Sequence, residues 1–353
     1  MMNHSVPRNR ISKEQYSIPG RKSIDHALNR RLLFDISRYQ KSSLAMTSCD
    51  LQSCYNRVAH TPALLAMLGY GIPSEPMYSM FHAIQYMKFT TRTVFRDSGE
   101  TFGGREPTFT CRPQGLGQGN GMGPQIWAVV SSRMFEVLHK KRGLETSFMT
   151  LMLKEVLKLC GFTFVDDSDI VAEAEGRNNP IVTLNSMQKT INCWEGVAKS
   201  TGGALAPSKS WWYLTHYVWD NNGNWEYGED TSKMEVNNLT ARDKNNSRID
   251  LEYSSSSSKK MLGVYLAPDS NNDKKQVEIM KERASKIAEL AWAGHIKKTE
   301  AWVVLTTMAM KSLEYSLPAP TLTENECNKI MWQLLNKILP KSGINRNIKK
   351  EVL

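Results

Sequence analysis

Residues 161–176, GFTFVDDSDIVAEAEG, place two short apolar runs on either side of a tight polar turn. Runs of this length around a turn predict a β-hairpin, although the turn lacks the Asn-Gly pair that two-residue hairpins favour. The hairpin tip carries the adjacent carboxylates of Asp166 and Asp167. Successive strand residues face opposite sides of a sheet, so neighbouring aspartates share one site only where a turn breaks the alternation. A hairpin tip provides that break.

A third carboxylate, Asp50, follows a buried strand predicted at residues 43–49, SLAMTSC. If the hairpin lies beside this strand, the three acids converge on one point. Carboxylate oxygens are ligands that Mg²⁺ prefers, and two such ions about 3.5–4 Å apart stabilise the attacking and leaving oxygens of a phosphoryl displacement. Each acid also has a purely structural interpretation, Asp50 as a helix N-cap and the pair as polar turn residues. We expect Asp169, two residues beyond the pair, to be a solvated turn acid.

The remaining chain alternates helical and strand patterns. Helical periodicity and capping signals predict helices at residues 23–39, 57–71, 75–87, 126–138 and 181–200. Strand patterns occupy residues 88–95 and 260–268, and a hairpin with the Asn-Gly signal is predicted at 211–228. Residues 226–259 are polar and include five consecutive serines, so we interpret them as a mobile insertion. Beyond residue 274 the chain is predominantly helical, with breaks expected near Pro318, Pro320 and Pro340.

Composition is that of a folded, non-membrane protein. The 353 residues are 41% apolar, and no stretch approaches the roughly 20 consecutive apolar residues that a membrane helix needs. The N-terminus lacks the apolar run of a secretory signal, so we expect an intracellular protein. The six cysteines are scattered without a CxxC pair, which favours reduced thiols in the core and makes a zinc site an unfavoured interpretation.

The charge balance suits a polyanionic partner. The formal net charge is +10, and residues 215–252 hold eight acids against four bases, so the rest of the chain carries +14. Lysine and arginine side chains that neutralise phosphates release counterions and bind nucleic acid. A basic protein without a nucleic-acid partner is the alternative.

Five blocks occur in a fixed order around these acids. They are SLAMTSCDLQSCY at 43–55, QGNGMGPQIW at 118–127, FVDD at 164–167, LAPSKSWWYL at 205–214 and MLGVYL at 261–266. An upstream segment, EQYSIPGRKSIDHAL at 14–28, precedes them. With these blocks the chain resembles the reverse transcriptases of retroelements, most closely those of the non-LTR type. The resemblance covers roughly 250 residues.

The resemblance implies an α+β fold with a polymerase palm, which is an antiparallel sheet backed by helices, together with a truncated fingers region and a helical thumb. The implied units are a fingers remnant at 1–42, the palm with its catalytic motifs at 43–214 and a polar hairpin insertion with a Ser-rich linker at 215–259. A primer-grip strand at 260–273 and a thumb-like region at 274–353 follow.

The resemblance also implies the chemistry. Asp50, Asp166 and Asp167 would hold two Mg²⁺ ions, with Mn²⁺ as an alternative, while a DNA primer 3′-hydroxyl attacks the α-phosphate of a dNTP on an RNA template. Tyr55 would exclude a 2′-hydroxyl by steric contact with the sugar, unless it is simply a core aromatic. Lys209 would act on the leaving pyrophosphate as a general acid, with a solvated surface lysine as the alternative.

Further residues are implied with less specificity. The resemblance places Gln118 and Gly119 beneath the incoming nucleotide, where glycine lets the backbone approach closely. Leu262 and Gly263 belong to the segment that grips the primer. Arg21 and Lys22, in the upstream segment, are candidate nucleic-acid contacts. Three further residues of the glycine-rich region have only a loop-shaping interpretation: Gly121, Gly123 and Pro124.

The chain departs from the family pattern before Gln15, because only fourteen residues precede it where relatives carry basic fingers strands. A truncated reading frame or a fragment of a longer protein is one interpretation. We therefore expect primer–template binding but poor polymerisation, unless four basic residues replace the triphosphate clamp: Arg21, Lys22, Arg30 and Arg31. A solvated helix face is the alternative for the last two.

Two other functions stay open at this point. One is a decayed or domesticated palm that binds nucleic acid without catalysis. The other is an RNA-dependent RNA polymerase, which would have to admit the 2′-hydroxyl that Tyr55 is expected to exclude.

Overall fold

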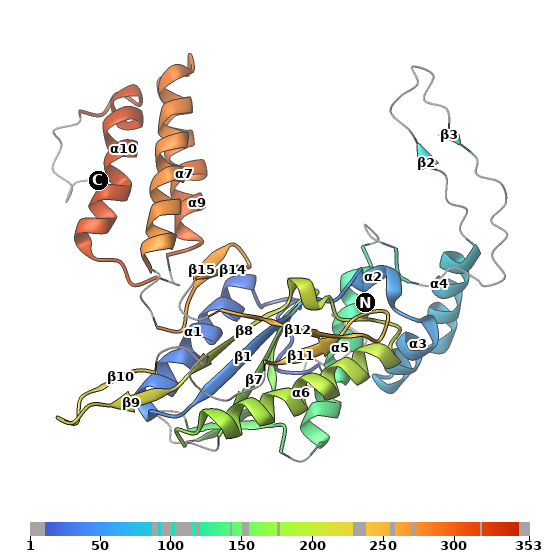
Figure 1. The fold of residues 1–353 in the computed structure, drawn as a ribbon. Coiled ribbons are helices and arrows are strands. Elements are labelled where there is room, and N and C mark those ends of the chain that lie inside the picture. Colours follow the sequence, from blue (N-terminus) through green and yellow to red (C-terminus); the bar gives the residue numbers. More distant parts are fainter. Residues whose placement is uncertain are drawn as a thin grey trace.

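A computed structural model describes most of the chain. The described residues are 11–86, 91–92, 101–102, 115–117, 121–141, 143–149, 155–174, 177–228, 238–254, 258–269, 273–317 and 320–345. They form both helices and strands, which confirms the expected α+β class (Figure 1). None of the described helices is long and apolar enough to cross a membrane.

The helices flank the central strands and form the C-terminal region. Their bounds are α1 Ser23–Gln40, α2 Cys54–Arg57, α3 His60–Gly69, α4 Ser74–Tyr86, α5 Gly123–Lys140, α6 Pro180–Ser200, α7 Asp273–Ala293, α8 Lys298–Val303, α9 Met310–Glu314 and α10 Glu324–Lys341. A short 3₁₀ turn spans Pro207–Lys209, and a π-helical stretch, Val304–Ala309, joins α8 to α9.

The strands form one five-stranded sheet and several hairpins. Their bounds are β1 Leu44–Cys49, β2 Thr91–Arg92, β3 Thr101–Phe102, β4 Thr146–Met149, β5 Val156–Leu159, β6 Gly161–Phe164, β7 Asp167–Glu173, β8 Trp211–Thr215, β9 Tyr217–Trp219, β10 Trp225–Tyr227, β11 Thr240–Arg242, β12 Arg248–Asp250, β13 Glu252–Tyr253, β14 Lys259–Met261 and β15 Val264–Leu266. The main sheet has the order β13-β8-β1-β7-β6, with β1 antiparallel to both neighbours.

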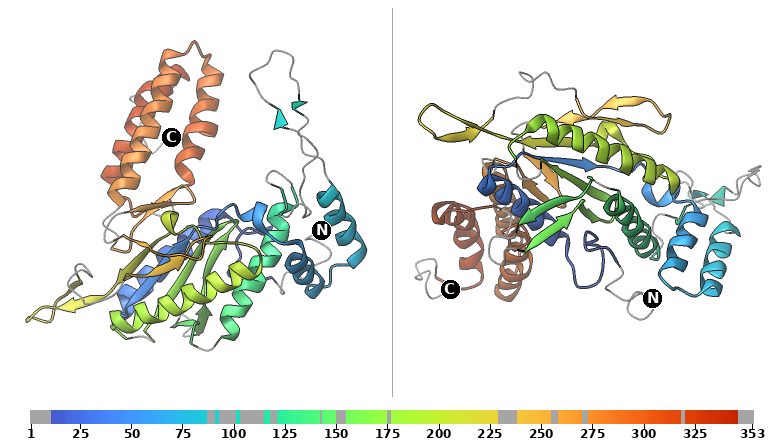
Figure 2. Two further views of the ribbon diagram at one scale, coloured as in Figure 1. Left: turned by 45° about the vertical axis from the view of Figure 1, so that its right-hand side comes forward. Right: turned by 90° about the horizontal axis from the view of Figure 1, so that it is seen from below.

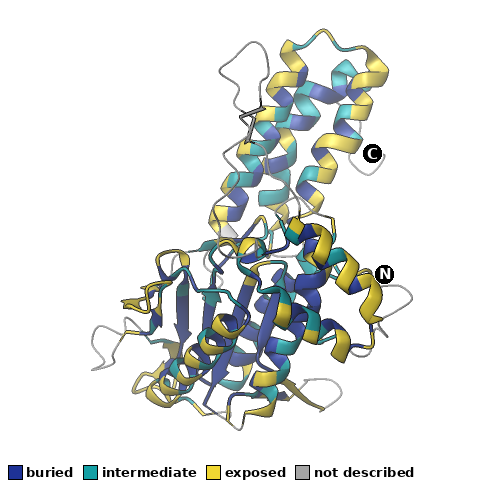
Figure 3. Ribbon diagram, turned by 90° about the vertical axis from the view of Figure 1, so that its right-hand side faces the viewer, coloured by how far each residue is buried: buried dark blue, intermediate teal, exposed yellow. Residues whose placement is uncertain are grey.

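Helices cover both faces of this sheet, as Figure 2 shows for α6 and α1. On one face, alternate residues such as Ala45 and Ile170 join the core formed with α3, α5 and α6. On the other face, Met46 and Val171 pack against Phe34 of α1. The strand at 43–49 is buried on both faces, and its buried residues include the hydroxyl side chains of Ser43 and Thr47; Figure 3 shows the strands as the buried layer.

The insertion expected to be mobile is ordered where it is described. Residues 238–254 form the hairpin β11–β12 and then add β13 parallel to β8. Leu239, Ala241 and Leu251 are buried in the main core, and Gln188 of α6 accepts a hydrogen bond from the Thr240 amide at 2.8 Å. The expectation was wrong here because a few apolar side chains at well-spaced positions suffice to anchor a polar segment.

Two further expectations need correction. Residues 260–268 form the hairpin β14–β15, because Leu262 and Gly263 take positive φ angles of 47° and 85° and turn the chain back. Gly123 and Pro124 begin α5, where proline is tolerated because the first helical amides lack intrahelical partners. The break expected near Pro340 is confirmed, because α10 has Pro340 in its last turn and ends at Lys341. Of the strand expected at 88–95, only Thr91–Arg92 is described.

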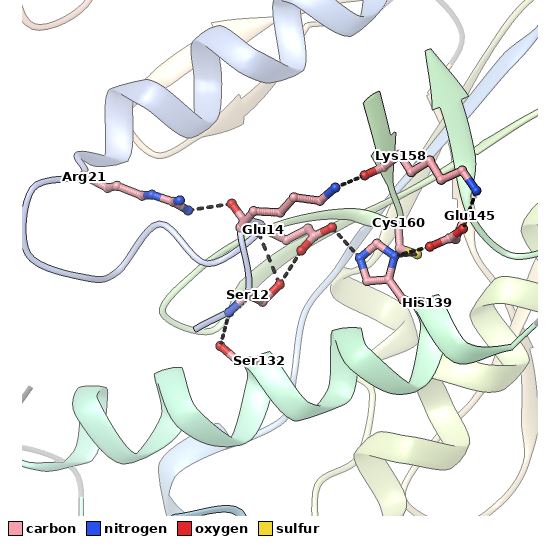
Figure 4. Close-up of polar contacts among 9 residues, drawn as sticks. Ser12, Glu14, Arg21, Ser132, His139, Glu145, Lys158 and Cys160 are labelled. Atoms are coloured by element: carbon pink, nitrogen blue, oxygen red, sulfur yellow. Dashed lines mark hydrogen bonds and ion pairs between the residues drawn. The ribbon is translucent and has the colours of Figure 1, made fainter. Parts of the chain in front are cut away.

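The N-terminal segment lies along the outer edge of β6. The Tyr16 amide donates to the Thr163 carbonyl at 2.8 Å, and the Thr163 amide donates to the Glu14 carbonyl at 2.9 Å. The Glu14 carboxylate is held by His139 of α5, whose imidazole lies between Glu14 and Glu145 (Figure 4). Both nitrogen–oxygen distances are 2.6 Å. We call Glu14, His139 and Glu145 the histidine clip.

The C-terminal helices α7, α8, α9 and α10 pack around a core of their own. They stand beside the main sheet, and α7 contacts β15 of the separate hairpin β14–β15 (Figure 1). The Tyr315 hydroxyl donates to the Leu262 carbonyl at 2.7 Å and lies 2.8 Å from Ser23 Oγ of α1. The division of the chain into five units stays a prediction.

Candidate active site

The sheet register brings the predicted acids to one end of β1. The last paired residues of β1 and β7 are Cys49 and Ser168, so the next positions are Asp50 on one strand and Asp167 on the other. Directly opposed residues on antiparallel strands have Cα atoms about 4.5–5.5 Å apart. Asp50 is not a helix cap, because Ser53 occupies the N-cap of α2.

A two-residue turn presents Asp166 beside this pair. Phe164 and Asp167 close the β6–β7 ladder, which leaves Val165 and Asp166 as the turn. Val165 has a φ of 59°, a conformation that strains a β-branched residue. The Trp127 indole donates to the Val165 carbonyl, and Thr163 Oγ1 donates to the Asp167 carbonyl at 3.1 Å. These bonds hold the turn where the sequence lacks a favourable turn signal.

Lys209 is brought to Asp50 by the turn that precedes β8. The Asp50 amide donates to Ser210 Oγ at 3.1 Å, and the Asp50 carbonyl accepts from the Ala206 amide at 2.9 Å. Lys209 ends the 3₁₀ turn between those two residues and is exposed. Burial raises the pKa of Asp50, and the negative charge of Asp166 adds to this rise. The positive charge of Lys209 lowers the pKa, but the net shift is upward.

The three carboxylates repel one another. Burial raises the pKa of Asp167 to about 6, and the negative charges of Asp166, Asp169 and Asp50 add to the effect, while His26 opposes it. A group of like charges that share one site disfavours ionisation. A cation bound at the site would relieve this repulsion.

This repulsion predicts a pH dependence in metal-free buffer. The folded-state pKa of Asp167, about 6, lies above its ordinary value of 3.8, so the folded state holds more protons between these values. Its contribution to the free energy of unfolding should therefore fall as pH rises from about 4 to about 6. Urea unfolding of the wild type and of Asp167→Asn, both in EDTA, measures this difference. Identical pH dependence in the two proteins would contradict the shift.

Tyr55 lies beside the acids on α2. Burial raises its pKa to about 12, with the Cys54 and Asp166 charges adding to the rise. The ring packs against the start of α5, where a Cβ on Gly123 would approach Tyr55 Cδ1 to 3.4 Å. Its hydroxyl is buried and has no hydrogen-bond partner in the described part of the chain. The ring thus belongs both to the core and to the edge of the site.

The other predicted residues that the structure describes lie on elements other than β1, β6, β7 and α2. Gln118 and Gly119 lie outside the described residues. Leu262 and Gly263 form the turn of β14–β15. Arg21 donates to the carbonyls of Lys13 and Gln15 at 2.5 and 2.7 Å, and its guanidinium stacks on Tyr16. This arginine therefore anchors the N-terminal segment, whereas Lys22 is exposed at the start of α1.

Sequence reasoning missed a buried charged group behind the site. Asp169 is not a solvated turn acid, because it is completely buried and lies 3.0 Å from His26 Nε2 and 3.6 Å from Arg30 Nη1. Burial tends to raise its pKa, but the Arg30 charge and the His26 contacts outweigh burial and lower it.

Arg30 and Arg31, two of the four basic residues considered as a replacement for the triphosphate clamp, do not lie free on a helix face. Arg30 is also completely buried, which excludes both the solvated-face and the phosphate-clamp interpretations. Arg31 is 19% exposed and donates to Thr321 Oγ1 at 2.5 Å.

The donor chemistry of the site suits Mg²⁺. Within the described ranges, no group of three or more His, Cys, Asp or Glu side chains lies close enough to hold a metal ion. Mg²⁺ usually takes one or two protein carboxylates and completes its shell with water and substrate phosphates. The oxygens of Asp50, Asp166 and Asp167 fit that donor requirement.

Comparisons with known proteins return telomerases. No protein-family model matches the sequence, and no curated protein matches it. The apo telomerase of Candida tropicalis matches with 13% identity and a TM-score of 0.42, over 95% of this chain and 51% of that one. The Candida albicans telomerase, solved with a TWJ fragment of telomeric RNA, matches with 10% identity and a TM-score of 0.32, over 92% and 48%. This chain spans about half the length of those telomerases.

Proposed function

We propose that this chain is the polymerase module of a reverse transcriptase of the retroelement type, which adds dNTPs to a DNA primer on an RNA template. The observation that carries the proposal is the register of β1, β6 and β7. It brings Asp50, Asp166 and Asp167 to one end of these three antiparallel strands, beside Lys209 and Tyr55. We propose residues 43–214 as the palm and 274–353 as the thumb-like region.

In this proposal the acids hold two Mg²⁺ ions, which would activate the primer 3′-hydroxyl and neutralise charge on the triphosphate. The 3′-hydroxyl would lose its proton to water, and its oxygen would form a bond to the α-phosphorus as the bond from that phosphorus to the leaving pyrophosphate breaks. Lys209 is exposed beside Asp50, so its ammonium is placed to give a proton to the pyrophosphate. Leu262 and Gly263 would support the primer strand.

Primer extension by the full chain tests the proposal. With enzyme in excess over an RNA template and DNA primer, we expect Mg²⁺-dependent incorporation of one dNTP and none in EDTA. Binding should weaken steeply with salt, because the basic charge releases phosphate counterions. Salt-sensitive binding without any incorporation would instead favour a decayed palm that only binds nucleic acid. Incorporation of ribonucleotides in preference to dNTPs would favour an RNA polymerase.

Tyr55→Ala should weaken sugar discrimination. Removing the ring opens space beside the acids, so we expect ribonucleotide incorporation relative to dNTP incorporation to rise at least about tenfold. Tyr39→Ala is the matched control, because Tyr39 is 72% exposed on α1. Competing single-nucleotide incorporation assays measure the ratio, and an unchanged ratio in Tyr55→Ala would remove the steric role.

A further inference from the structure

The buried side chains of Asp169, His26 and Arg30 lie between the predicted catalytic turn and helix α1. All three residues are 0% exposed. His26 and Arg30 stand one helical turn apart on α1, and both reach Oδ2 of Asp169. Because buried ion pairs are often no more stabilising than apolar residues of similar volume, stability alone does not account for this group.

Arg30 is in contact with three strands. Its Nη1 lies 3.6 Å from Asp169 on β7 and donates to the Met261 sulfur on β14 at 2.8 Å. Its guanidinium carbon is 4.7 Å from the centre of the Trp211 ring on β8. Nε and Nη2 have no hydrogen-bond partner among the described residues. Both polar contacts of the guanidinium with the strands therefore fall on a single nitrogen.

The hairpin β14–β15 is bound to the same surroundings by other contacts. The Tyr213 hydroxyl on β8 accepts from the Lys259 amide and donates to the Leu266 carbonyl, both at 3.1 Å. The Tyr265 amide donates to Gln276 of α7 at 2.9 Å. Ala27 of α1 packs with the apolar residues of β15. The hairpin thus contacts α1, β8 and α7. Arg30 makes a polar contact with both this hairpin and β7.

We propose that Arg30 is a positioning residue that couples the hairpin β14–β15 to the catalytic hairpin β6–β7 through Asp169. The inference rests on the proposed function, in which the first hairpin supports the primer and the second carries two of the acids. Asp169 stands two residues from Asp167, which is roughly 7 Å along a strand. Movement of either hairpin therefore changes the distances from Arg30 Nη1 to Asp169 Oδ2 and to the Met261 sulfur.

Such a link matters because phosphoryl transfer depends mainly on positioning. A displacement of about 1 Å between reacting groups is enough to lower a rate by about 10²-fold. The planar guanidinium also lies over the Trp211 ring, a stacking contact that a flexible ammonium does not reproduce. Arg30→Lys, which keeps the charge, should therefore recover only part of the function lost in Arg30→Met.

The test compares Asp169→Asn with the double variant Arg30→Met/Asp169→Asn. The double variant avoids leaving a lone buried charge, so it should stay folded even where a single variant does not. Arg38→Met removes a positive charge from the same helix, and in the structure its guanidinium pairs with Asp35 and not with Asp169. Urea unfolding establishes that each protein is folded before further measurement.

Two readouts separate coupling from general destabilisation. Hydrogen exchange at the Lys259 and Tyr265 amides should accelerate at least about tenfold in the double variant and stay unchanged in Arg38→Met. Incorporation should fall by about 10², while the primer–template Kd stays within about twofold.

Unchanged exchange at Lys259 and Tyr265 in the folded double variant would overturn the coupling. Faster exchange with an unchanged incorporation rate would reduce the link to a structural one and also overturn the proposal. If the wild type incorporates nothing, the proposed function fails, but the exchange measurement still decides whether the two hairpins are coupled.

Discussion

Asp166→Asn is expected to lower Mg²⁺-dependent incorporation by about 10³-fold without unfolding the protein. Asparagine keeps the shape of the side chain but removes the charge, and an electrostatic contact made in the transition state is worth a loss of this size. Asp166 is exposed at a two-residue turn, so no core packing is lost. Its removal also relieves the repulsion that raises the pKa of Asp50.

Single-turnover incorporation and urea unfolding should be measured on the same preparation of Asp166→Asn. Asp250→Asn is the control, because Asp250 is an exposed acid on β12 with no part in the site. We expect Asp250→Asn to match the wild type in both measurements. A wild-type rate in Asp166→Asn would refute the assignment of the site, whatever the stability of the variant.

The main sheet and the position of Asp50, Asp166 and Asp167 at one end of its strands were predictable because local patterns determine them. The strand at 43–49 carries the apolar residues Leu44, Ala45, Met46 and Cys49 in a short run, and a hairpin appears as two apolar runs around a turn, as at 161–176. The strained Val165 turn has no such signal, because Trp127 and Thr163 supply contacts that compensate for an unfavourable turn residue. The local sequence shows that the turn lacks favourable residues, but it does not show the contacts from Trp127 and Thr163 that stabilise the turn.

The buried group of Asp169, His26 and Arg30 was missed for a different reason. Asp169 and His26 are 143 residues apart, and a single acid beside a turn is usually solvated. The helix did carry a signal, since His26 and Arg30 lie four residues apart on the face that includes Ala27 and Leu33. Charged residues on the buried face of an amphipathic helix imply buried partners elsewhere.

His139→Gln is expected to lower the free energy of unfolding by about 3 kcal/mol, because it leaves the buried Glu14 carboxylate without its charged partner. Glu14 is only 2% exposed. The Cys160 sulfur and the two glutamates raise the pKa of His139 to about 11, against the effect of burial. The contribution of the His139 imidazolium to the free energy of unfolding is therefore fully present below pH 6.5, the ordinary pKa of histidine. It is lost as pH rises towards 11.

Protonation of Glu14 and Glu145 weakens the histidine clip at low pH. Burial tends to raise the pKa of Glu14, but the hydrogen bonds from His139 and Ser12 outweigh it and lower that pKa; the His139 contact also lowers the pKa of Glu145. Their contributions are present above pH 4.5, the ordinary value, and are lost on acidification. The clip should thus be strongest between about pH 5 and pH 6.5. Urea unfolding of the wild type and His139→Gln at pH 6 and pH 10 should show the larger difference at pH 6.

Loss of the histidine clip should also increase the solvent exposure of β6 in the hairpin β6–β7. Glu14 and Tyr16 pair with Thr163 on the outer edge of β6, so release of the N-terminal segment exposes the Thr163 amide to solvent. We expect hydrogen exchange at Thr163 to accelerate in His139→Gln and to stay unchanged in His82→Gln, a control histidine on the exposed side of α4. Equal stability and equal exchange in His139→Gln and the wild type would show that the clip does not hold this edge. Faster exchange at Thr163 would mean that a side chain on α5 supports the strand that presents Asp166 and Asp167.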